Sequence, residues 1–252
     1  MCYNKLYKSS LQFIIPFGVI YMYYYETHLH TYPVSRCAKV GVRESLEFYK
    51  EIGHDGVFIT NHFLGGSINI NEPMTYEEKI NFYFSDYEDA LKIGKEIGIK
   101  VFLGVETSYC GTDFLIYGLD KAWFLAHPEI MEMRKSEELS FFKENGALVI
   151  QAHPFREASY IDHLRLYPRS IHGAEIINSC RTELENKMAK LFAENYDLIQ
   201  FAGSDNHWGK DIASRKGKIA GMCSETPVAD EKEFIEAVLN GNMSVFEKVL
   251  TD

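Results

Sequence analysis

The stretch Tyr23-Tyr-Tyr-Glu-Thr-His-Leu-His30 joins an apolar, aromatic run to a His-x-His pair. The run predicts a β-strand. His28 and His30 are two residues apart, so both imidazoles leave the same face of an extended chain, where they can chelate one cation. This stretch therefore predicts the first strand of the fold and one wall of a metal site.

Other apolar runs end in the same kind of side chain. The ligand types follow the runs Val57-Phe-Ile-Thr-Asn-His62, Val101-Phe-Leu-Gly-Val-Glu106, Leu148-Val-Ile-Gln-Ala-His153 and Leu198-Ile-Gln-Phe-Ala202, the last of which leads into Asp205-Asn-His207. Seven candidate ligands thus come after apolar strands on the carboxyl-terminal side. In parallel barrels, that rim is where active sites are built. Imidazoles and carboxylates are ligands for Zn, Mn or Fe ions, so the pattern predicts a metal centre.

The apolar runs alternate with amphipathic ones, which predicts strands joined by helices and a mainly parallel sheet. The expected strands are Tyr21–His30, Gly56–His62, Lys100–Tyr109, Phe114–Leu119, Ala147–His153, Gly173–Asn178 and Leu198–Ser204. The expected helices are Val42–Ile52, Tyr76–Ile97, Ala122–Lys143, Thr182–Asn195 and Asp230–Leu239, and several of them are followed by glycine. We expect a single α/β domain, a distorted seven-stranded (β/α)7 barrel of the TIM-like kind. A doubly wound open sheet is the alternative.

Composition narrows the function classes. The 252 residues are 46% apolar and 25% charged, which is ordinary globular composition and excludes a disordered, collagenous or coiled-coil chain. A net charge of −10 disfavours binding to long nucleic acids, which requires a surplus of Lys and Arg. Five cysteines without a C-x-x-C pair are typical of a reduced compartment, so we expect a cytoplasmic protein.

The N-terminal segment is apolar from Leu11 to Tyr25. Pro16 and Gly18 interrupt it, it has no small-residue cleavage site, and it is too short to span a bilayer. We therefore expect no membrane partner. We expect Met22 to be the natural start, residues 1–21 to be an extension outside the fold, and residues 22–252 to form the barrel domain.

The ordered motifs resemble those of the polymerase and histidinol phosphatase (PHP) family. They are Glu26-Thr-His-Leu-His-Thr31, Ile59-Thr-Asn-His62, Gly104-Val-Glu106, Ala152-His-Pro-Phe155 and Gly203-Ser-Asp-Asn-His207. The resemblance runs from about Tyr23 to His207. It implies a distorted seven-stranded barrel with two or three divalent metal ions (Zn, Mn or Fe) that hydrolyses phosphate esters.

The resemblance also implies roles for individual residues. His28, His30, Glu106 and Asp205 would hold one ion. Glu106 would bridge to a second ion held also by His153, and His62 and His207 would belong to a third. Glu106, Asp205 and His207 are the residues we assign to catalysis, through a hydroxide that bridges two ions.

Three positions depart from the family pattern. Asn61 stands where many relatives have Asp, which removes a charge next to the metal ligands. Relatives often supply a further ligand after His-x-His, and here only Cys37 is available, so the third ion is expected to bind weakly. A ligand is also usual on the strand after Glu106; Asp113 is the favoured candidate, and His127 is expected to be an ordinary helix residue.

Arginine binds phosphate oxygens bidentately. Arg156 and Arg181 lie near the predicted rim and are our substrate-binding candidates, with Arg36 in the first loop as a weaker one. The expected substrate is a small phosphate monoester of histidinol-phosphate or nucleotide-phosphate type. The alternatives are a metal-dependent nuclease or phosphodiesterase acting on short single strands, and a barrel that binds metal or a phospho-ligand and regulates without turnover.

Overall fold

A computed structural model describes residues 14–15, 18–19, 21–70 and 73–250. Nine strands form one sheet in the order β11-β10-β3-β4-β5-β6-β7-β8-β9, and two short strands, β1 (Ile14–Ile15) and β2 (Gly18–Val19), pair with each other. The nine are β3 (Tyr23–Glu26), β4 (Gly56–Ile59), β5 (Lys100–Tyr109), β6 (Thr112–Tyr117), β7 (Leu148–Ala152), β8 (Gly173–Asn178), β9 (Ile199–Gly203), β10 (Lys218–Ser224) and β11 (Ser244–Val249). The expected extension, residues 1–21, lies largely outside the described residues.

The prediction of seven strands was wrong, because the sheet has nine. The prediction of a mainly parallel sheet was also wrong, because half of its strand pairs are antiparallel. Only the pairs β3–β4, β4–β5, β7–β8 and β8–β9 are parallel. Strand β6 runs antiparallel to both neighbours because a two-residue hairpin joins it to β5. Both hairpin residues, Cys110 and Gly111, have positive φ (49° and 80°), as tight turns between twisted strands require. The two unforeseen strands, β10 and β11, are also antiparallel.

The sheet curls until its first predicted strand meets its last. The segments beyond β3 and β9 form a parallel bridge between Leu29 and Asn206. Two backbone hydrogen bonds make it, from His30 N to Asn206 O at 3.0 Å and from Asn206 N to His28 O at 3.2 Å. The fold is therefore a nearly closed mixed α/β barrel in one domain, and the open-sheet alternative is excluded.

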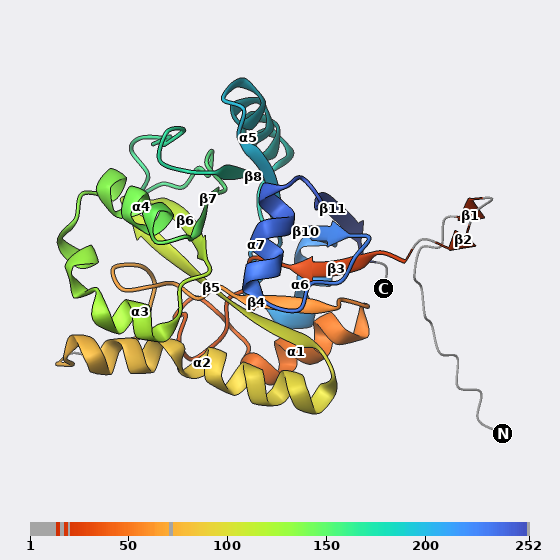
Figure 1. The fold of residues 1–252 in the computed structure, drawn as a ribbon, viewed down its shortest axis with the longest axis horizontal. Helices are drawn as coiled ribbons and strands as arrows, with labels where there is room; N and C mark the ends of the chain where they lie inside the picture. The colour runs from red at the N-terminus through yellow and green to blue at the C-terminus, as the bar shows by residue number, and fades with distance from the viewer. Residues whose placement is uncertain (1–13, 16–17, 20, 71–72, 251–252) are drawn as a thin grey trace.

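Helices cover the outside of the barrel. Figure 1 shows α1 (Val42–Glu51) and α2 (Tyr76–Ile97) side by side on one flank, and α5 (Glu183–Asn195) at the other end of the molecule. The expected helix over residues 122–143 is broken at Pro128 into α3 (Lys121–Ala126), a 3₁₀ turn (Pro128–Glu132) and α4 (Lys135–Glu144). The remaining helices are α6 (Ile212–Lys216) and α7 (Glu231–Leu239). Among the described residues, no helix combines the length and apolar character needed to cross a membrane.

Aromatic side chains fill the barrel beneath the predicted rim. Phe58 of β4 and Phe102 of β5 stack at 4.8 Å between ring centroids, and Tyr117 meets Phe58 edge-on at 5.1 Å. Phe234 of α7 inserts among them, 4.5 Å from Phe58. This dry core supports the strand ends that carry the polar residues.

One buried histidine lies outside that region and gives the stability of the fold a pH dependence. His54 is 4% exposed and packs against Tyr49 and Phe246, and neither of its ring nitrogens has a hydrogen-bond partner among the described residues. Burial, with a smaller contribution from Lys248, lowers the pKa of His54 from 6.5 to about 3. The native state therefore holds His54 neutral where the unfolded chain takes up a proton.

We predict that His54 makes stability fall as the pH drops below 6.5. Its contribution is complete above the unfolded pKa and is lost at up to about 1.4 kcal/mol per pH unit below it. In denaturant titrations, the decrease in unfolding free energy from pH 7.5 to 5.5 should be about 1.4 kcal/mol smaller for His54→Phe. His163→Phe, at an exposed position, should leave that decrease unchanged. Equal decreases in wild type and His54→Phe would contradict the prediction.

Candidate metal centre

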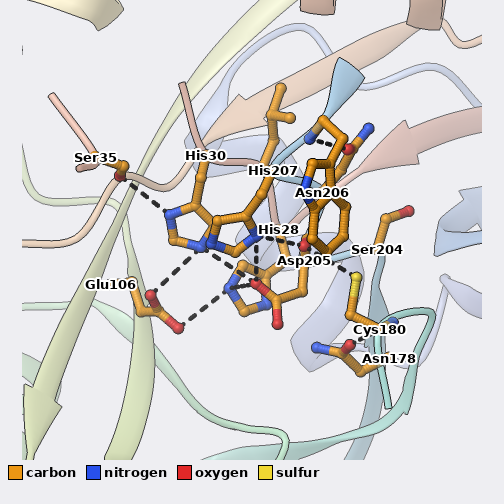
Figure 2. Close-up of polar contacts among 12 residues, drawn as sticks. His28, His30, Ser35, Glu106, Asn178, Cys180, Ser204, Asp205, Asn206 and His207 are labelled. Atoms are coloured by element: carbon orange, nitrogen blue, oxygen red, sulfur yellow. Dashed lines mark hydrogen bonds and ion pairs between the residues drawn. The ribbon is translucent and has the colours of Figure 1, made fainter. Parts of the chain in front are cut away.

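Residues from opposite ends of the sequence meet at the carboxyl-terminal rim. Nε2 of His28 lies 3.1 Å from a Glu106 oxygen and 3.6 Å from Asp205 Oδ1. Nε2 of His30 lies 3.4 Å from each of these two carboxylates. Figure 2 shows both imidazoles directed at Glu106 and Asp205, as the His-x-His spacing predicts. The barrel closure between Leu29 and Asn206 brings these segments together.

Strand geometry brings two more residues to the cluster. His62 is four residues after Phe58 and Glu106 is four after Phe102, so each points to the same inner side as the aromatic residue below it. His62 and Glu106 also face each other across a parallel bridge, with Nδ1 of His62 2.6 Å from Glu106 Oε2. His153, after β7, places Nε2 3.6 Å from Glu106 and 3.8 Å from Asp205.

The backbone is strained at two of these residues. His153 (φ 27°) and Asp205 (φ 55°) both adopt left-handed conformations, which non-glycine residues rarely do. Such strain persists where the surroundings determine it, most often at functional sites. Gly203 permits a close approach beside Asp205, because a Cβ there would lie 2.5 Å from that of His28. The backbone at these strand ends therefore takes unusual conformations that place the His153 and Asp205 side chains in the cluster.

Hydrogen bonds set the tautomers of three histidines. Glu175 accepts from Nδ1 of His28 at 3.0 Å, which directs Nε2 toward Glu106 and Asp205. Ser35 donates its proton to Asn61 at 2.8 Å, so it can only accept from Nδ1 of His30 at 3.2 Å. The carbonyl of Asp205 accepts from Nδ1 of His207 at 2.8 Å. Orientation of this kind is typical of metal-ligating histidines.

The resulting cluster fits divalent cations. Buried ligand-type atoms that make no hydrogen bond among the described residues, and touch only each other or charged neighbours, include His28 Nε2, His30 Nε2, His62 Nδ1, Glu106 Oε2 and Asp113 Oδ2. Buried polar atoms are rarely left unpaired, and these converge on one another. Four groups have ligand atoms within 4.8 Å of one another: His30/His62/His207, His28/His30/Glu106, His28/His153/Asp205 and Glu106/Asp113/His153. The set is that of a candidate multi-metal centre.

Burial and neighbouring charges shift the pKa values of these residues strongly. Burial alone would lower the pKa of His28, but the carboxylates of Glu175, Asp205 and Glu106 raise it well above its usual value. Burial and the neighbours His207 and His62 lower the pKa of His30 well below its usual value. Burial would raise the pKa of Glu106, yet the surrounding imidazoles lower it well below its usual range. Perturbations of this size in one cluster are typical of functional sites.

Cys37 lies next to two of the histidines. Burial would raise the pKa of its thiol, but hydrogen bonds to the His207 and His62 side chains outweigh burial and lower that pKa to about 6.

The structure places the candidate ligands Asp113 and His127 in different surroundings. Asp113 lies in the cluster, with Oδ2 3.9 Å from His153 Nε2, whereas the His127 side chain pairs with Glu129 at the surface. Arg36 donates to the backbone oxygen of Ile68 and, within the described part of the chain, makes no ion pair with the cluster.

Two buried carboxylates were missed by the sequence analysis. Glu175 lies inside β8, in the apolar run Gly-Ala-Glu-Ile-Ile-Asn, and orients His28; a charge in so apolar a strand was the available signal. Asp86 lies on α2 and accepts from Asn61 Nδ2 at 3.2 Å and from Thr31 Oγ1 at 2.7 Å. The negative charge that Asn61 lacks is thus supplied by Asp86, which lies behind Asn61 and accepts a hydrogen bond from it.

Both arginine candidates border the cluster. Arg156 Nη2 lies 3.2 Å from Asp113, and Arg181 Nη2 lies 3.7 Å from Asp205. Nε of each is buried without a hydrogen-bond partner in the described part of the chain. Each guanidinium therefore keeps donor capacity at the rim.

Comparison with known proteins defines the fold. No protein-family model matches the chain. An uncharacterized protein of Methanocaldococcus jannaschii is 32% identical over 108 residues, which are 39% of this chain and 46% of that protein, so the chain matches less than half the length of this relative.

Three known structures are similar. A two-domain protein from Bacteroides vulgatus that contains a predicted PHP-like metal-dependent phosphoesterase has a TM-score of 0.64 at 15% identity, over 89% of this chain and 64% of that one. PsfC from Pseudomonas syringae has a TM-score of 0.56 at 13% identity, over 91% and 92%. A candidate metal-dependent phosphoesterase from Bifidobacterium adolescentis has a TM-score of 0.50 at 14% identity, over 73% and 88%. The chain has the PHP fold.

We predict that Glu106→Gln reduces the metal content of the protein by about one ion per chain or more. The substitution removes the negative charge that lies among His28, His30 and His62 and that lets dications bind close together. Elemental analysis after loading with Mn²⁺ or Zn²⁺ and desalting measures this. Glu129→Gln, which removes a surface carboxylate beside His127, should retain full metal content. Unchanged metal in Glu106→Gln would show that Glu106 holds no ion.

Proposed function

We propose that the protein is a metal-dependent phosphoesterase that hydrolyses small phosphate monoesters. The observation that supports this most directly is the convergence of buried imidazole and carboxylate groups with two arginines at one rim. No cysteine or serine placed as a nucleophile is needed, because phosphoryl transfer depends chiefly on positioning and charge stabilisation. The PHP fold of the chain is consistent with this function.

Different side chains would bind different ions. His28, His30, Glu106 and Asp205 would hold one ion, Glu106 and His153 with Asp113 a second, and His62 and His207 a third. Divalent ions, when bound, supply a water of lowered pKa and positive charge close to the phosphoryl oxygens. Zn, Mn and Fe all accept this set of ligands.

The protein's own groups orient the ester. Arg156 and Arg181 flank the cluster, one beside Asp113 and one beside Asp205, so their guanidiniums can receive phosphoryl oxygens from two sides. Glu175 and Ser35 orient the imidazoles of His28 and His30 so that Nε2 of each faces the carboxylates of Glu106 and Asp205. Each of these contacts exists before substrate arrives, which is the pre-organisation that electrostatic catalysis requires.

We predict that the purified protein hydrolyses p-nitrophenyl phosphate with added Mn²⁺, that a chelator abolishes the activity, and that bis(p-nitrophenyl) phosphate is cut more slowly. Two arginines suit a terminal phosphoryl group with three free oxygens better than a diester with two. Faster cleavage of the diester would instead favour the nuclease or phosphodiesterase alternative. Absence of both activities in metal-loaded protein would favour a barrel that binds without turnover.

We predict that Arg181→Met lowers kcat/KM for the monoester by about 10- to 100-fold, the cost of one charged hydrogen bond. Metal content should be unchanged, because the arginine donates to substrate and holds no ion. Arg43→Met, which removes a surface pair with Glu96, is the matched control and should keep full activity. Equal activity of Arg181→Met and wild type would exclude Arg181 from substrate binding.

A further inference from the structure

Asp86 is a buried carboxylate on helix α2 that the proposed chemistry does not use. Its side chain is 4% exposed. Its Oδ2 accepts hydrogen bonds from Thr31 Oγ1 at 2.7 Å, from Asn61 Nδ2 at 3.2 Å and from the backbone N–H of Val34 at 3.3 Å. A carboxylate can be buried at acceptable cost when donors surround it in this way. Asp86 therefore ties α2 to the segments that follow β3 and β4.

The side-chain amide of Asn61 has a single favourable orientation. Its Oδ1 accepts from the backbone N–H of Thr31 at 2.7 Å and from Ser35 Oγ at 2.8 Å. Its Nδ2 donates to Thr31 Oγ1 at 2.9 Å and to the Asp86 carboxylate. In a flipped amide, Nδ2 would face the N–H of Thr31 and Oδ1 would face Asp86, so donor would meet donor and acceptor would meet acceptor. Thr31 and Asp86 together thus fix which atom of Asn61 faces Ser35.

The orientation of Asn61 determines how Ser35 contacts the histidines. Because Ser35 donates its proton to Asn61 Oδ1, its oxygen accepts from the backbone N–H of His62 at 3.0 Å and from Nδ1 of His30 at 3.2 Å. Nε2 of His30 then carries the lone pair, and it faces the two carboxylates of the cluster at 3.4 Å. The side chains of Ser35, Asn61 and His30 are at most 1% exposed, so these contacts are shielded from solvent.

We propose that Asp86 is a positioning residue of the metal centre and that it acts on His30 through Asn61 and Ser35. Three successive hydrogen bonds lead from its carboxylate to the imidazole, which they hold with Nδ1 protonated and Nε2 directed at the ion. The inference rests on the metal-dependent chemistry of the proposed function, in which His30 is a ligand. Partners of this kind behind a ligand typically change metal affinity by about 10- to 100-fold when they are altered.

The same contacts explain why Asp, which the family pattern has at position 61, does not suit this chain. With Asp there, an oxygen would take the place of Nδ2, 3.2 Å from Oδ2 of Asp86. Two carboxylates buried at that distance repel each other, and one of them would have to take up a proton. Asn61 and Asp86 are therefore a matched pair, and an acidic residue at position 61 requires a neutral one at position 86.

Metal affinity measured without substrate tests the role of Asp86. Mn²⁺ is titrated into the full-length protein in competition with a fluorescent chelator. Asp86→Leu removes the acceptor and should raise the Mn²⁺ dissociation constant by about 10- to 100-fold. Asp86→Asn retains an acceptor oxygen and should restore most of the lost affinity.

Tyr83→Phe is the matched control. It removes a buried hydrogen bond of 2.8 Å from the same helix to the backbone oxygen of Asn61. That oxygen keeps a second donor, the backbone N–H of Glu106 at 3.1 Å, and the contacts from Asp86 to His30 do not include it. Tyr83→Phe should therefore leave the Mn²⁺ dissociation constant unchanged.

Substitutions at position 61 test the matched pair, and they decide the question should Asp86→Leu fail to fold. Asn61→Asp should weaken Mn²⁺ binding even though it restores the family residue, because it places a second carboxylate beside Asp86. The double variant Asn61→Asp with Asp86→Asn contains one carboxylate again. It should bind Mn²⁺ more tightly than Asn61→Asp alone, which is a coupling that independent sites do not show.

The outcomes separate this inference from the proposed function. Wild-type affinity in Asp86→Leu, or equal losses in Asp86→Leu and Tyr83→Phe, would overturn the positioning role of Asp86. A double variant that binds no better than Asn61→Asp would overturn the matched pair. Failure of the wild type to bind Mn²⁺ would overturn the metal centre and this inference with it. The expected affinities without phosphatase activity in the wild type would overturn the proposed function and support the role of Asp86.

Discussion

The barrel closure is the constraint on which the site depends. Two backbone hydrogen bonds across Leu29 and Asn206 join the first and last ligand-bearing segments, which are about 180 residues apart in the chain. Because side chains alternate along an extended segment, this pairing directs Leu29 into the core and its two histidine neighbours to the site. The contacts of His28 and His30 with Asp205 thus follow from a register set by the backbone.

Burying the polar cluster without a metal ion costs folding free energy. Glu106 and Asp205 are buried among imidazoles, and burying charges in a dry barrel requires that they be paired. A proton on His28, whose pKa is raised, offsets part of the free-energy cost of burying the carboxylates. Burial instead lowers the pKa of His30, whose Nε2 makes no hydrogen bond among the described residues. A cation among the lone pairs satisfies all of these groups at once. The left-handed backbone at His153 and Asp205 is a further cost that such a site can sustain.

Local patterns predicted the strand ends well, because apolar runs and two-residue spacing are encoded within a few residues. His28, His62, Glu106 and Asp205 all lie where that reading placed them. Features that depend on distant contacts were not predictable in this way. The direction of β6 follows from its hairpin, and the function of Glu175 is visible only once His28 lies beside it. The short apolar run of β10, Ile219 to Cys223, was overlooked, and β11 mixes apolar and charged residues.

Charge balance bears on the proposed substrate. Four carboxylates of the cluster (Glu106, Asp113, Glu175 and Asp205) and two guanidiniums (Arg156 and Arg181) leave two negative charges when the imidazoles are neutral. Two divalent ions would turn this into two positive charges, and a third ion would make four. In either state a phosphate monoester dianion neutralises more of the surplus than a diester monoanion does, and in a buried site that difference in charge is strongly felt. The net charge of −10 over the whole chain does not oppose this, because the local cations override it.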